Sequence, residues 1–167
     1  MKIAIIGPSK IDYVKDISKD AEKIIEEIVK AILDDEIYLV PDKGSVSEFF
    51  GIRYLENGGG NLKPLIPLED TEFGYDWVNP DLAENVSCGN WRNQPENLNE
   101  RTEVMICLGY SVGGMAEMAY SKWFNKKPIL VVKELVSEEM PKDAVRDLDI
   151  RYVSYKDLIG ELNKLGK

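Results

Sequence analysis

The chain has 167 residues, of which 44% are hydrophobic and 31% are charged. This length and composition predict a single globular domain over residues 1–167 and exclude a disordered or fibrous chain. The formal net charge of −9 repels polyanions, so we expect no nucleic-acid partner. The sequence has no histidine, which excludes Ser-His-Asp and Cys-His catalytic sites and histidine zinc sites.

The two cysteines, Cys88 and Cys107, lie in apolar surroundings without a CxxC motif, and we expect both to be buried free thiols. The carboxylates are scattered, so neither a metal nor another cofactor is implied. The apolar run before Gly7 is too short for a signal peptide, and no window reaches the roughly 18 apolar residues of a membrane span. We therefore expect a cytoplasmic protein without a membrane partner. Abundant Ile, Lys and Glu favour a thermophilic source.

Short apolar runs alternate with longer amphipathic runs, a pattern typical of βαβ units around a parallel sheet. The sequence therefore predicts a three-layer, doubly wound α/β fold with a mostly parallel sheet of six or seven strands. The predicted strands are Lys2–Ile6, Glu36–Val40, Lys63–Pro67, a stretch near Glu84–Cys88, Val104–Leu108 and Pro128–Val132, with Arg151–Val153 as a short edge strand.

Two helices are predicted to connect the first three strands. Apolar residues from Ile17 to Ile32 recur at three- and four-residue steps, which predicts one long crossover helix. Ser45 stands three residues before Glu48, a capping-box spacing, and begins a second helix that ends at Gly58–Gly60.

Two more helices follow the fifth strand. Residues 115–124 are apolar nearly all round, so we expect this helix to be the most buried one. Ser154 and Asp157 are predicted to cap a final helix. The apolar stripe of that helix comprises Leu158, Leu162 and Leu165.

The apolar helix over residues 115–124 also suggests a homo-oligomer, most simply a homodimer. Met118, Trp123 and Phe124 are suitable interface residues. The alternative is that a neighbouring helix of the same chain covers them.

The segment Asp70–Trp91 departs from the βα rhythm, because it carries glycine, proline and three aromatic residues. It is a candidate lid or binding loop. The alternative is an irregular connection in which Phe73, Tyr75 and Trp77 cover the edge of the sheet.

Three loops follow predicted strands at the edge where α/β folds bind ligands, namely Gly7–Ser9, Asp42–Ser47 and Gly109–Gly114. Each combines small residues with hydroxyl groups, and the last two lead into helices, as in phosphate-binding sites. Each loop by itself can be explained as an ordinary βα turn. Because three such loops are expected at the same edge of the sheet, together they favour an anion or nucleotide site. The candidate binding residues are Gly7, Pro8, Ser9, Lys43, Gly44, Ser45, Ser47, Gly109, Ser111, Val112, Gly113 and Gly114.

Glu117 is the candidate catalytic residue, because it falls early in the apolar helix and would point toward the mouth of the site. The alternative is a carboxylate that only interacts with the helix dipole. Arg92 could bring a guanidinium to a phosphate in the same crevice, and Arg101 is a weaker candidate for that role. Lys10 and Lys43 are further possible counter-ions.

The segment VMICLGYSVGGMAEMA resembles the SLOG superfamily of Rossmann-like nucleotide-binding proteins. That superfamily includes the Lonely Guy phosphoribohydrolases, often labelled lysine decarboxylases, and the DNA-processing protein A group. In the hydrolase motif PGGxGTxxE, Gly113 matches the last glycine and Glu117 the acidic residue, while Gly109, Tyr110, Ser111 and Gly114 replace the Pro, the two leading glycines and the Thr.

The hydrolases also carry an arginine upstream of their glutamate, which Arg92 matches best. The resemblance implies a nucleotide or sugar-phosphate ligand. Three readings of function remain: a binding or sensing protein, a phosphoribohydrolase that cleaves the N-glycosidic bond of a nucleoside 5′-monophosphate through Glu117 and Arg92, and a structural or partner-binding domain.

Overall fold

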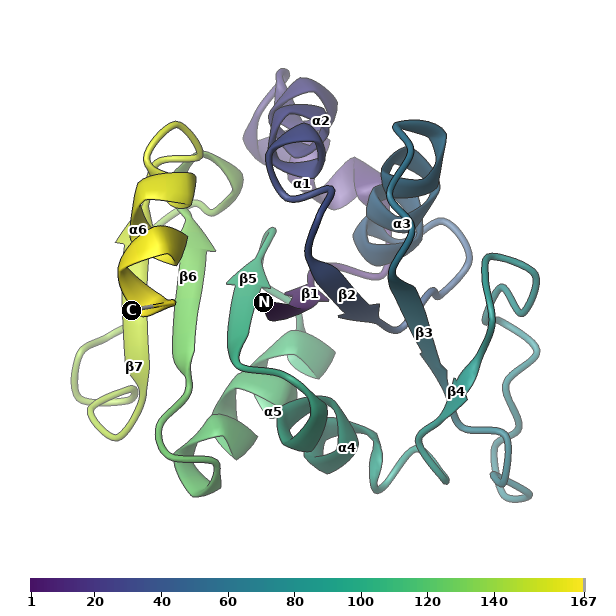
Figure 1. The fold of residues 1–167 in the computed structure, drawn as a ribbon. Helices are drawn as coiled ribbons and strands as arrows, with labels where there is room; N and C mark the ends of the chain where they lie inside the picture. Colours follow the sequence, from purple (N-terminus) through teal and green to yellow (C-terminus); the bar gives the residue numbers. More distant parts are fainter. Residues whose placement is uncertain (167) are drawn as a thin grey trace.

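The first strand occupies the middle of a seven-stranded sheet whose order is β4-β3-β2-β1-β5-β6-β7, with every pairing parallel. A computed structural model describes residues 1–166, and Figure 1 shows the arrangement. The strands are β1 (Lys2–Ile6), β2 (Glu36–Leu39), β3 (Leu62–Ile66), β4 (Val86–Ser87), β5 (Val104–Cys107), β6 (Pro128–Val132) and β7 (Asp149–Val153). The predicted doubly wound, parallel α/β fold is confirmed.

Helices cover both faces of this sheet (Figure 1). Residues of α1, α2, α3 and α6 pack with Ile3 and Ile5 of β1, whereas residues of α4 and α5 pack with Ala4 and Ile6. This alternation follows from the strand period of two, which sends successive side chains to opposite faces. The helices are α1 (Ile11–Ile17), α2 (Ala21–Ala31), α3 (Val46–Glu56), α4 (Gln94–Arg101), α5 (Val112–Tyr120) and α6 (Leu158–Leu165), with 3-10 turns at Ser121–Trp123 and Lys133–Leu135.

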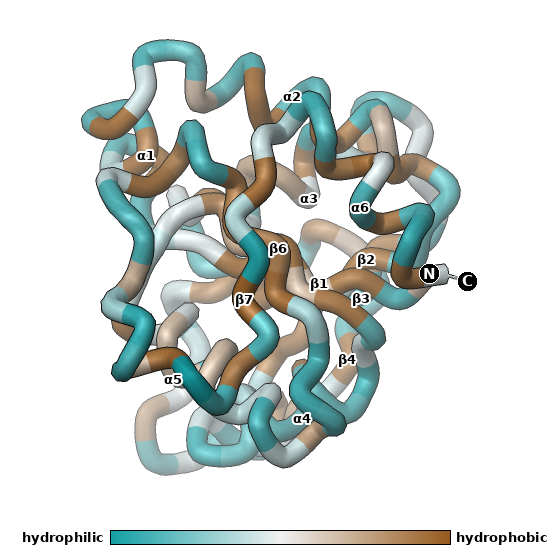
Figure 2. Tube along the Cα trace, turned by 90° about the vertical axis from the view of Figure 1, so that its left-hand side faces the viewer, coloured by the Kyte–Doolittle hydropathy of each residue, from teal (hydrophilic) through white to brown (hydrophobic). Residues whose placement is uncertain are grey.

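The central strands are apolar along most of their length, and the polar residues gather in loops and on the outer helices (Figure 2). Strands that are buried on both faces require such continuous apolar runs. Cys88 and Cys107 are free and buried in this core, as the sequence predicted. Within residues 1–166, no helix combines the length and hydropathy needed to cross a membrane.

Three details of the predicted helices were wrong. The first crossover is two helices, because α1 ends at Ile17 and the chain turns before α2 begins at Ala21. The predicted cap of α6 is absent: Asp157 precedes the helix without a side-chain cap. The hydroxyl of Ser154 instead donates to Glu134.

The third error concerns α5, which is not the most buried helix. Val112 is 82% exposed, Met115 46%, and Trp123 in the following turn 69%. Only Gly114, Glu117 and Met118 of α5 are buried. Only one narrow face of α5 packs against the rest of the chain. Its apolar composition therefore predicted more burial than the structure shows.

Candidate functional site

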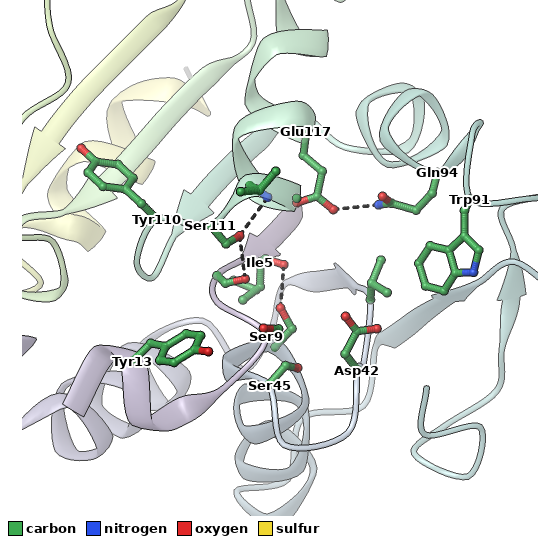
Figure 3. Close-up of a pocket in the computed structure, with 16 residues that line it drawn as sticks. Ile5, Ser9, Tyr13, Asp42, Ser45, Trp91, Gln94, Tyr110, Ser111 and Glu117 are labelled. Carbon is green, nitrogen blue, oxygen red and sulfur yellow. Dashed lines mark hydrogen bonds between the residues drawn. The ribbon is translucent and has the colours of Figure 1, made fainter. Parts of the chain in front are cut away.

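A cleft of about 550 Å³ opens at the carboxyl ends of β1, β2 and β5. β1 pairs with β2 on one side and β5 on the other, so the cleft lies where the strand order reverses, the usual ligand position in open α/β sheets. Figure 3 shows its side chains. The lining residues are Ile5, Gly7, Ser9, Tyr13, Val40, Asp42, Ser45, Ser47, Trp91, Gln94, Tyr110, Ser111, Val112, Gly113, Gly114 and Glu117.

The N-terminus of α5 forms one wall of the cleft. Ser111 caps the helix: its hydroxyl accepts a 2.9 Å hydrogen bond from Gly114 N–H and donates to the carbonyl of Gly7 at 3.3 Å. In the described chain the N–H groups of Val112 and Gly113 have no hydrogen-bond partner, and the first turn holds no acidic residue. This helix end therefore offers free donors and positive potential to a ligand.

The N-terminus of α3 also borders the cleft but is largely satisfied within the chain. Ser45 accepts a 3.0 Å hydrogen bond from Glu48 N–H, and the Glu48 carboxylate accepts one of 2.6 Å from Gly44 N–H. Val46 N–H donates to the carbonyl of Pro8 at 3.0 Å. The predicted Ser45 cap is thus confirmed, but Glu48 bonds the N–H of Gly44 rather than that of Ser45, as a full capping box would require. The acidic Glu48 offsets the positive potential that an anion would need.

Glu117 lies on the buried face of α5 and lines the cleft. Its Oε1 accepts a 2.7 Å hydrogen bond from Gln94 Nε2 on α4, as Figure 3 shows. Asn99 of α4 donates to the Glu117 backbone carbonyl at 2.9 Å. Burial raises the pKa of Glu117 to about 7, and the nearby Asp42 charge acts in the same direction, while the Gln94 hydrogen bond opposes them. Glu117 can therefore exchange a proton near neutral pH.

Asp42 follows β2 and points into the cleft opposite Glu117 (Figure 3). Its Oδ1 is buried and accepts no hydrogen bond from any described residue. Burial, reinforced by the charge of Glu48, raises the pKa of Asp42 to about 6. A desolvated carboxyl oxygen without a donor is costly, and a ligand with N–H groups would relieve that cost.

Trp91 closes the cleft beside Gln94 (Figure 3). Its ring stacks on Trp77 with 5.2 Å between centroids and 14° between planes. Its indole N–H donates to the carbonyl of Gly74 at 2.6 Å. Asp70 accepts hydrogen bonds from the backbone N–H groups of Trp91 and of three residues of the same loop. The segment Asp70–Trp91 thus folds back on itself and fixes the position of the Trp91 ring.

The structure brings most of the predicted binding residues together with Glu117. The predicted residues that line the cleft are Gly7, Ser9, Ser45, Ser47, Ser111, Val112, Gly113, Gly114 and Glu117. The remaining predicted positions, Pro8, Lys43, Gly44, Gly109 and Arg92, are not among the lining residues.

None of the predicted cations, Arg92, Arg101, Lys10 and Lys43, lines the cleft, and two of them have partners elsewhere. Nη2 of Arg92, whose side chain is 71% exposed, bonds both carboxylate oxygens of Glu72 at 2.7 and 2.8 Å. Lys43 donates to the backbone carbonyl of Asp76 at 2.8 Å. The lining residues, all within the described chain, include neither lysine nor arginine, so the donors at the site are backbone N–H groups, hydroxyls and the Gln94 amide.

Gly109 does not line the cleft but allows the backbone beneath it to pack closely. Its φ is +121°, and an added Cβ would lie 2.6 Å from Val14 Cγ1 and 3.0 Å from Pro8 Cδ. Only glycine fits this conformation and this close approach of the first and third loops.

Sequence reasoning did not identify seven of the lining residues: Ile5, Tyr13, Val40, Asp42, Trp91, Gln94 and Tyr110. Asp42 belonged to a predicted binding loop, and its position shortly after a strand could have identified it as a cleft residue. Trp91 ends the segment Asp70–Trp91, which the sequence marked as a candidate binding loop, but nothing singled it out there. Gln94 carried no signal, because only the packing of α4 against α5 brings it to the cleft.

Comparison with known proteins shows the fold. No protein-family model matches the chain, and no curated protein matches it. Among solved structures, the Moco carrier protein from Chlamydomonas reinhardtii has a TM-score of 0.72 and 17% identity, with 98% of this chain and 96% of that one covered. The molybdenum cofactor binding protein from Rippkaea orientalis has a TM-score of 0.74 and 15% identity, over 99% and 97%.

A third structure, TM1055, a structural-genomics target, has a TM-score of 0.74 and 18% identity over 98% of both chains. These similarities extend over nearly the whole chain and establish a Rossmann-like fold. Membership of the SLOG superfamily stays a prediction.

Proposed function

We propose that this protein binds a phosphorylated small molecule, a nucleotide or a cofactor of similar build, with the phosphate at the N-terminus of α5. The observation that carries the proposal is the pair of unpartnered N–H groups of Val112 and Gly113, which border the cleft at a helix end without an acidic residue. Glycine at positions 113 and 114 allows a phosphate to approach the backbone closely.

The structural neighbours support the binding of a small molecule. Two of them are named for carrying or binding the molybdenum cofactor, so proteins of this fold hold small cofactors. The cleft of about 550 Å³ falls in the size range of small-molecule and cofactor sites.

Charge substitutions at Val112 test the proposal by titration calorimetry with guanosine 5′-monophosphate, adenosine 5′-monophosphate and ribose 5-phosphate. Val112→Glu places a carboxylate in the first turn of α5, which stabilises the helix but repels a phosphate. We expect the variant to unfold no earlier than the wild type and to bind phosphorylated ligands at least about tenfold more weakly. Val112→Gln is the uncharged control and should bind as the wild type does. Equal affinities for the Glu and Gln variants would refute the proposal.

Glu117 supports a second candidate function, hydrolysis of the N-glycosidic bond of a nucleoside 5′-monophosphate. A buried carboxyl group that exchanges its proton near neutral pH suits an acid or base role in the cleft. The cation that the resemblance implied is not supplied by Arg92, which pairs with Glu72, so binding without turnover is the better supported function. Release of free base by the wild type and its loss in Glu117→Gln, with nucleotide affinity retained, would favour hydrolysis.

A further inference from the structure

The cleft has two chemically different ends. At one end lie the free N–H donors of α5. Asp42, Gln94 and Glu117, here called the acceptor wall, lie on the side toward Trp91, with Glu117 about one turn along α5 from those donors (Figure 3). Gln94 donates an amide N–H to Glu117, and no described residue donates a hydrogen bond to the Gln94 carbonyl oxygen or to the second Glu117 oxygen. Asp42 Oδ1 has no donor within residues 1–166. The acceptor wall therefore requires a ligand group rich in hydrogen-bond donors.

Trp91 adds a flat surface next to the acceptor wall. Trp77 stacks on the ring and does not line the cleft, so the Trp91 face opposite Trp77 is the one available to a ligand. The fixed orientation matters, because a side chain held by the Asp70 loop loses little conformational freedom when a ligand binds. Aromatic rings of this kind bind planar heterocycles by stacking.

Resting on the proposed function, we infer that the ligand carries a 2-amino-4-oxopyrimidine ring, as in guanine or a pterin, that stacks on Trp91 and donates its ring N–H and 2-amino group to the carboxylate of Asp42. Such a ring presents two adjacent N–H donors on one edge, which matches the two oxygens of one carboxylate. Adenine has an acceptor nitrogen beside its amino group, and hypoxanthine lacks the 2-amino group, so both leave an acceptor of the wall unpaired.

Two matched ligand pairs test the assignment by titration calorimetry at pH 7.5. Guanosine and inosine 5′-monophosphates differ only in the 2-amino group, and pterin and lumazine differ at the same ring position. We expect the 2-amino member to bind at least about tenfold more tightly in one or both pairs. Preference in the first pair identifies a guanine nucleotide as the source of the ring; preference in the second alone identifies a pterin.

Three variants separate the ring from the phosphate. Asp42→Asn should bring the affinity ratio within each pair close to one while leaving the affinity for ribose 5-phosphate unchanged. Trp91→Leu should weaken both members of a pair about tenfold, again with ribose 5-phosphate unaffected, so retained sugar-phosphate binding reports the folded cleft. Trp123→Phe, outside the cleft, is the control and should change neither value.

The outcomes distinguish the two proposals. Equal affinity within both pairs, together with phosphate-dependent binding, would overturn the ring assignment and leave the proposed function standing. Discrimination that disappears on adding EDTA would assign the carboxyl groups to a cation and would also overturn it. Failure of ribose 5-phosphate and every nucleotide to bind would overturn the proposed function itself.

Discussion

Gln94 Nε2 donates a 2.7 Å hydrogen bond to Glu117 Oε1 inside the protein, and this bond joins the first turn of α4 to the buried face of α5. It holds a carboxyl group at the cleft although burial disfavours its charge. The hydrogen bond therefore positions Glu117 and partly opposes the rise in its pKa that burial causes.

Glu117 should make the stability of the protein fall as the pH rises. Its folded-state pKa of about 7 is above the ordinary value of 4.5, so between these values the folded chain holds a proton that the unfolded chain has lost. The stabilisation is complete below about pH 4.5 and is lost as the pH rises through about 7. The raised pKa of Asp42, about 6, acts in the same direction.

Glu117→Gln removes this dependence while keeping an acceptor for Gln94. We expect the variant to gain roughly 3 kcal/mol in free energy of unfolding relative to the wild type at pH 8, and almost nothing at pH 4.5. Urea unfolding at the two pH values measures the difference. A stability difference that is the same at both pH values would show that Glu117 does not titrate in this range.

Gly109→Ala should destabilise the protein by at least about 2 kcal/mol, because the added methyl would meet Val14 and Pro8 at a residue with positive φ. Gly160→Ala is the matched control. Gly160 lies in α6 with open space around its missing Cβ, so alanine there should raise stability by about 0.5–1 kcal/mol. Similar melting temperatures for the two variants would contradict the role assigned to Gly109.

Asp70→Ala should loosen the loop that positions Trp91. The carboxylate accepts four backbone hydrogen bonds, and these bonds lower its pKa. Without them, backbone amides of residues 70–91 should exchange with solvent faster, while amides of β1 and β5 keep their protection. Glu96→Ala, an acidic residue in the first turn of α4, is the control. Unchanged exchange in the loop would contradict its dependence on Asp70.

We still predict a homodimer, because α5 has an exposed apolar face. Of the predicted interface residues, Met118 is buried within the chain, whereas Trp123 is exposed, as are Val112 and Met115. Burying such exposed residues against a second copy would remove apolar area from water. Light scattering should give about twice the chain mass for the wild type, and Trp123→Glu should shift it toward the monomer. Phe73→Glu, at an exposed aromatic residue of the Asp70–Trp91 loop, should leave the mass unchanged. A monomeric wild type would refute the prediction.

Sequence patterns predicted the fold well because its strands are continuous apolar runs and its turns carry glycine. They overestimated the burial of α5, since composition does not say how much surface its neighbours cover. At the site, the position of the backbone N–H groups at the start of α5 was predictable. A strand, a loop of small residues and a helix follow one another around Ser111–Gly114. The Arg92–Glu72 pair and the Gln94–Glu117 hydrogen bond join residues far apart in the chain, and no local pattern records such contacts.

The most direct test of the central claim observes the α5 amides themselves. In a ¹H–¹⁵N correlation spectrum titrated with guanosine 5′-monophosphate, the N–H signals of Val112 and Gly113 should shift downfield and saturate, as expected for donors that gain a phosphate acceptor. Saturable binding that leaves these two signals in place while moving others would contradict the account.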